Sequence, residues 1–83
     1  MDVINNLKKF FDSEYKSTEL FVKRHFKDTD IVYFVVESSI KMCLGAAQFA
    51  QYFDNVSYEE VTKIYDEVKE KLEKLREGWK NVY

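Results

Sequence analysis

Proline is absent from this chain of 83 residues, and glycine occurs only twice. These two residues most often interrupt helices and form turns, so their scarcity favours long uninterrupted helices. Cysteine and histidine occur once each, as Cys43 and His25. One cysteine excludes an intrachain disulfide and a cysteine-rich zinc module, and one histidine excludes a multi-histidine metal site.

Motifs of catalysis and cofactor binding are also missing from the sequence. There is no glycine-rich phosphate loop, no nucleophile elbow and no Glu-x-x-His pair of a di-iron bundle. We therefore expect no catalytic residues, no cofactor and no metal, and a protein that is not an enzyme. His25 is expected to pack in or at the edge of the core, and Cys43 is expected to be an inert packing residue.

An excess of charge of either sign is lacking too, because 13 basic and 15 acidic residues give a net charge of −2. This balance disfavours a role in nucleic-acid binding. The first residues lack the basic and apolar pattern of a signal peptide, so we expect a cytoplasmic protein. The most apolar stretch, residues 31–53, contains Glu37, Lys41 and two glutamines, which argue against a membrane span.

What the chain does contain is typical of one small globular domain, covering residues 1–83. Hydrophobic residues make up 46% of it and aromatic residues 17%, enough for a packed core. Their spacing predicts helices over about 3–26, 31–53 and 58–80. Ser57 and Glu60 form a capping box at the third start, and a heptad seam follows at Val61, Tyr65, Val68, Leu72, Leu75, Trp79 and Val82.

Three helices of similar length with short joints predict an all-α, elongated, antiparallel three-helix bundle. Ser17 could begin a separate helix, because Ser-Thr-Glu resembles a cap. The apolar face keeps its phase through that point, so we expect one continuous helix there.

The middle predicted helix has two apolar faces and only a narrow polar sector. One face is large, with Ile31, Val35, Met42, Phe49 and Phe53. The other is small, with Ser39, Cys43, Ala46, Ala47 and Ala50. We expect the small face to be a self-association face in a homodimer, because small side chains allow close helix approach. In the alternative, a monomer, the two outer helices cover one face each.

The outer helices carry stripes of opposite charge. The candidate partner surface of the first helix is Lys9, Lys16, Leu20, Lys23 and Lys27, and the candidate acidic stripe of the third is Glu59, Asp66, Glu70, Glu73 and Glu77. The ordinary interpretation of both stripes is that they are solvated helix faces, and the alternative is that they are docking surfaces. Tyr52, Tyr58 and Tyr83 near the joints and terminus are weaker candidate contacts.

These features favour a non-catalytic protein–protein interaction module, a small inhibitor, regulator or accessory protein that acts by surface occupancy. The alternative is a small nucleic-acid-binding protein that uses the lysine stripe.

Overall fold

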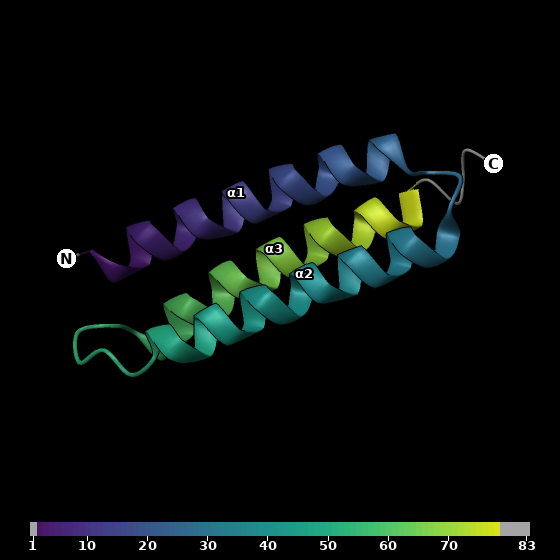
Figure 1. Ribbon diagram of the computed structural model, residues 1–83. Coiled ribbons are helices and arrows are strands. Elements are labelled where there is room, and N and C mark those ends of the chain that lie inside the picture. Colours follow the sequence, from purple (N-terminus) through teal and green to yellow (C-terminus); the bar gives the residue numbers. More distant parts are fainter. Residues whose placement is uncertain (1, 79–83) are drawn as a thin grey trace.

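The computed structural model describes residues 2–78, which form three helices in an elongated bundle with a long axis of about 44 Å. They are α1 (Val3–Arg24), α2 (Thr29–Ala50) and α3 (Tyr58–Gly78). Figure 1 shows them side by side in alternating directions, with short connections at opposite ends. The predicted all-α three-helix bundle is confirmed, and α1 passes through Ser17 without a break.

Polar side chains begin each helix by accepting hydrogen bonds from otherwise unpaired backbone N–H groups. Asp2 accepts from the backbone of Asn5 at 3.0 Å, and Asp28 accepts from Ile31 at 3.2 Å. At the start of α3, Ser57 accepts from the backbone of Glu60 at 3.4 Å. The capping box thus supplies the serine bond expected from the sequence.

The helix ends differ slightly from the predicted ranges, and local hydrogen bonds explain why. α1 ends at Arg24 because His25 leaves helical geometry and its backbone N–H closes the last turn on Phe21 and Val22. α2 starts at Thr29, since Asp28 is its cap. It ends at Ala50, before the predicted residue 53, because the next three backbone N–H groups bond to carbonyls three residues earlier, in tighter turns.

All three helices contribute to one continuous core. The buried apolar residues are Leu7, Phe11 and Val22 of α1, Val32, Val36, Ile40, Cys43, Ala47 and Ala50 of α2, and Val61, Ile64, Val68 and Leu72 of α3. The seam predicted for the third helix is therefore present, with Tyr65 and Leu75 half-buried along it. Its predicted continuation, Trp79 and Val82, lies outside the described residues.

The expected self-association face of the middle helix is wrong, because that face lies inside the bundle. Ser39, Cys43, Ala47 and Ala50 are buried and Ala46 is half-buried, so none of them offers an open surface. Small side chains on α2 let both α1 and α3 approach closely, whereas phenylalanine or methionine there would hold the three helices apart. The large apolar face consequently points away from both neighbours.

Candidate functional site

The outward side of α2 is the most unusual surface of the molecule. Phe34 is 70% exposed, Phe49 65%, Met42 52% and Ile31 43%. They belong to what we call the outer stripe, whose members recur at spacings of three and four along one helix face. The outer stripe consists of Ile31, Phe34, Val35, Ser38, Met42, Gly45, Phe49 and, just beyond the helix, Phe53.

The outer stripe alternates bulky and small positions. Ser38 and Gly45 separate its large side chains, and a methyl group placed on Gly45 would meet no atom within 4 Å. At the C-terminal end, the rings of Phe49 and Phe53 pack edge to face with centroids 5.6 Å apart. The outer stripe thus has protruding aromatic side chains with open space between them. Helices pack by fitting the side-chain ridges of one into the grooves of the other, so this surface is suited to contact with another helix.

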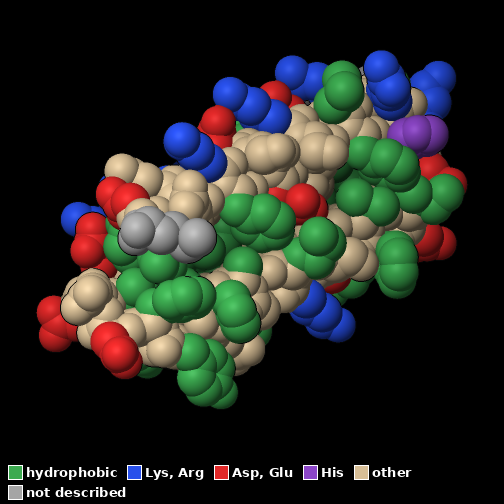
Figure 2. All heavy atoms as spheres, turned by 60° about the vertical axis from the view of Figure 1, so that its left-hand side comes forward, with side chains coloured by type: hydrophobic (Ala, Val, Ile, Leu, Met, Phe, Trp, Pro, Cys, Tyr) green, Lys and Arg blue, Asp and Glu red, His purple; other side chains and the backbone are tan. Residues whose placement is uncertain are grey.

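The exposed apolar area is large for so small a chain. Taking about 200 Å² for a whole phenylalanine side chain, Phe34, Phe49 and Phe53 together expose roughly 350 Å². Ile31 and Met42 raise this to the order of 500 Å², which is the size of the largest apolar patch on a typical monomer, and such patches often have a function. Figure 2 shows hydrophobic side chains spread over one face of the molecule, below an upper edge along α1 that is lined with Lys and Arg.

Polar contacts border the outer stripe on the α3 side. Arg76 of α3 donates to the Glu37 carboxylate of α2, and its guanidinium lies over the Tyr33 ring at 4.8 Å. Glu37 is the only acidic residue in the middle of α2, and its carboxylate is therefore already paired. Lys41 is the other charged residue there and is exposed.

The lysine stripe runs along α1 and ends with Lys27, which lies in the connection to α2. It is solvent-exposed, but part of its charge is neutralised. Lys16 pairs with Asp12 at 3.0 Å, and Lys23 pairs with Glu19 at 3.7 Å. Lys9 and Lys27 are also exposed, and Leu20 stands among the lysines at 51% exposure. Because two of the four lysines already have carboxylate partners, the stripe offers less positive charge to a polyanion than the sequence indicates.

The acidic stripe of α3 lies on the outside of the bundle. Glu59, Asp66, Glu70 and Glu77 are exposed, and Glu73 is half-buried. Glu70 pairs with Lys74 at 3.1 Å, one of the i,i+4 pairs that favour the helix. Tyr52 and Tyr58, near the joint between α2 and α3, are also exposed, whereas Tyr83 lies outside the described residues. Whether these stripes bind a partner stays a prediction.

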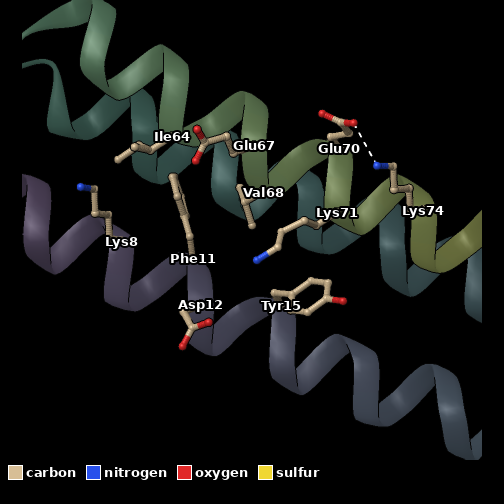
Figure 3. A pocket seen from close by; sticks show the side chains of 10 residues that line it. All are labelled: Lys8, Phe11, Asp12, Tyr15, Ile64, Glu67, Val68, Glu70, Lys71 and Lys74. Atoms are coloured by element: carbon tan, nitrogen blue, oxygen red, sulfur yellow. Dashed lines mark ion pairs between the residues drawn. The ribbon is translucent and has the colours of Figure 1, made fainter.

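A shallow open groove of about 450 Å³ lies on the surface between α1 and α3 (Figure 3). Phe11, Ile64 and Val68 form its apolar base, and the Lys71 ammonium lies over the Tyr15 ring at 5.0 Å. The rim carries three ammonium groups and three carboxylates, from Lys8, Lys71, Lys74, Asp12, Glu67 and Glu70. With these charges balanced, the groove has no net charge with which to select an ionic ligand.

The two side chains with potential chemistry occupy ordinary structural positions. Cys43 is fully buried. Its burial, and to a lesser extent the negative charge of the Glu14 carboxylate, raise the pKa of the thiol to about 11. The thiol therefore stays protonated and unreactive. His25 is exposed at the end of α1, and its ring stacks on Phe21 at 4.3 Å. The expected place of this histidine in or at the edge of the core is therefore wrong, because its ring is exposed and packs on Phe21 outside the core cluster.

Three further findings bear on function. Within residues 2–78, no three metal-ligating side chains gather into a site. No helix in this part of the chain combines the length and apolar character needed to cross a membrane. Comparison with protein-family models, with curated proteins and with solved structures finds no match to this chain. The exposed surfaces are therefore the features of this chain that point to a function.

Proposed function

We propose that this chain is a non-catalytic protein–protein interaction module that acts by occupying a surface of its partner, as small inhibitors, regulators and accessory proteins do. The observation that carries the proposal is the outer stripe of α2. An apolar surface that its own fold leaves open, bordered by satisfied polar groups, has the composition of the centre of a protein interface.

The magnitude of the gain supports a binding role. At about 25 cal/mol per Å², covering the roughly 350 Å² of exposed phenylalanine is worth on the order of 9 kcal/mol. Association costs an estimated 4–15 kcal/mol in lost freedom of motion. Covering the outer stripe therefore offsets an association cost of this size, and the contacts around it, including the charged stripes of α1 and α3, add the net affinity and orient the partner.

Photo-crosslinking in the producing cell tests this proposal. A benzophenone-bearing phenylalanine in place of Phe49 is expected to give covalent adducts with a protein after irradiation, and mass spectrometry identifies that protein. The matched control carries the same group in place of Lys69, an exposed residue of α3. Equal labelling from both positions, or no adduct from position 49, would contradict the proposed role of the outer stripe.

A further inference from the structure

Several residues of the outward side of α2 lie at equal distances on either side of Met42. Seven positions before it stands Val35, and seven positions after it stands Phe49. Four positions away on either side are two small residues, Ser38 of the outer stripe and Ala46, a half-buried residue between the stripe and the core. At the two ends of the stripe, eleven positions away, are Ile31 and Phe53. These pairs give the face a partial two-fold pattern about Met42, from which Phe34 and Gly45 depart because their mirror positions are the buried Ala50 and Ser39.

A surface of this kind is complementary to an inverted copy of itself. When two α2 helices lie antiparallel with Met42 at the two-fold axis, each Phe49 faces a smaller Val35, and each Phe53 faces an Ile31. Ser38 faces Ala46, which leaves room for the two flexible methionine side chains at the centre. Antiparallel helix dipoles also attract, whereas a parallel pair would align them unfavourably.

From this symmetry we infer that the occupant of the outer stripe is a second copy of this chain, bound antiparallel about Met42. The inference rests on the proposed function and specifies its partner. Two copies contribute apolar area on the order of 1,000 Å² from the large exposed residues alone, which reaches the lower limit for a specific interface. A partner with a polar surface would supply only half of that apolar area.

Disulfide mapping tests the arrangement directly, in a chain whose native thiol is removed by Cys43→Ala. Single cysteines are introduced by Val35→Cys, Met42→Cys or Phe49→Cys, and circular dichroism checks that each variant keeps its helices. Antiparallel pairing predicts efficient cross-linking of the Met42→Cys variant with itself. The Val35→Cys and Phe49→Cys variants should cross-link when mixed and remain uncross-linked alone. Lys69→Cys on α3 is the control and should not cross-link.

Sedimentation equilibrium measures the association itself, and the expected species has twice the 10.0 kDa chain mass. Met42→Lys places two ammonium groups at the axis and should weaken dimerisation by at least about 100-fold. The control Gln48→Lys adds the same charge at an exposed position beside the outer stripe and should have little effect.

The remaining outcomes overturn the inference. Self-cross-linking of all three stripe variants would indicate parallel pairing, and a dimer without any of these cross-links would use another face. A monomer throughout the range of about 1–100 µM excludes the second copy, yet it leaves the proposed function standing if the benzophenone at position 49 labels a different protein. No adduct of any kind would reject both.

Discussion

The orientation of α2 can be tested with two changes of a single methyl group, two residues apart. Gly45 lies on the open side of the helix with no atom near its absent side chain, and no glycine among the described residues has a positive φ. Gly45→Ala should therefore stabilise the chain by about 1 kcal/mol, the difference in helix propensity between the two residues. For a domain of this size, the melting temperature should rise by about 4–8 °C.

Ala47 is only 3% exposed and faces the interior, so removing its methyl group should have the opposite effect. Ala47→Gly loses about 1 kcal/mol of helix propensity and about 0.8 kcal/mol of apolar burial. The melting temperature should then fall by about 7–14 °C. The two variants are expected to differ by about 3 kcal/mol in the free energy of unfolding.

Urea denaturation followed by circular dichroism measures both variants. The protein concentration is lowered until the midpoint no longer changes, so that only the unfolding of single chains contributes. If Gly45→Ala destabilises the chain and Ala47→Gly leaves its stability unchanged, the face of α2 that carries Gly45 is the one packed against α1 and α3. That result would refute the assignment of the outer stripe.

Three further predictions concern the core and the lysine stripe. The buried Cys43 thiol has its pKa raised from 9.0 to about 11, so the unfolded chain loses this proton first as pH rises. The stabilisation present below pH 9 should be lost between pH 9 and 11, by about 2 kcal/mol, and Cys43→Ala should remove this dependence in urea titrations. Ser39→Ala should cost about 1–3 kcal/mol in the same assay, because it deprives the buried Thr18 hydroxyl of its partner at 3.0 Å, and adding Thr18→Val should recover part of the loss. Lys16→Glu with Lys23→Glu breaks two exposed ion pairs and should change stability by only about 1 kcal/mol each, while weakening capture of any partner that uses the stripe.

The three helices could be predicted from the sequence because their signals are local. Asp2, Asp28 and Ser57 accept backbone hydrogen bonds within three residues, and such caps are visible as residue types at fixed spacing. The seam of α3 is also local, since Val61, Val68 and other members recur within one helix. Nothing beyond the chain's own periodicity was required for these features.

Which face of α2 is buried could not be predicted, because that depends on the volume between three helices. A helical wheel shows two apolar faces but contains no information about how closely α1 and α3 approach. Phe34 was missed for a related reason, since it lies within a run of apolar residues that hides the periodicity. The contact of Arg76 with Glu37 joins residues 39 positions apart, and no sequence spacing indicates it.

The corrected orientation of α2 changes how the surfaces of the molecule divide between roles. With the small residues inside, the self-association that we infer uses the outer stripe, which lies on a different helix from the lysine stripe of α1. A dimer about Met42 therefore leaves the lysine stripe of each copy outside the pairing contact and presents it twice. Charge reversal at Lys16 and Lys23 should then weaken partner capture without changing the sedimenting mass, whereas Met42→Lys should lower that mass. If both changes shifted the mass equally, the two surfaces would not be separate.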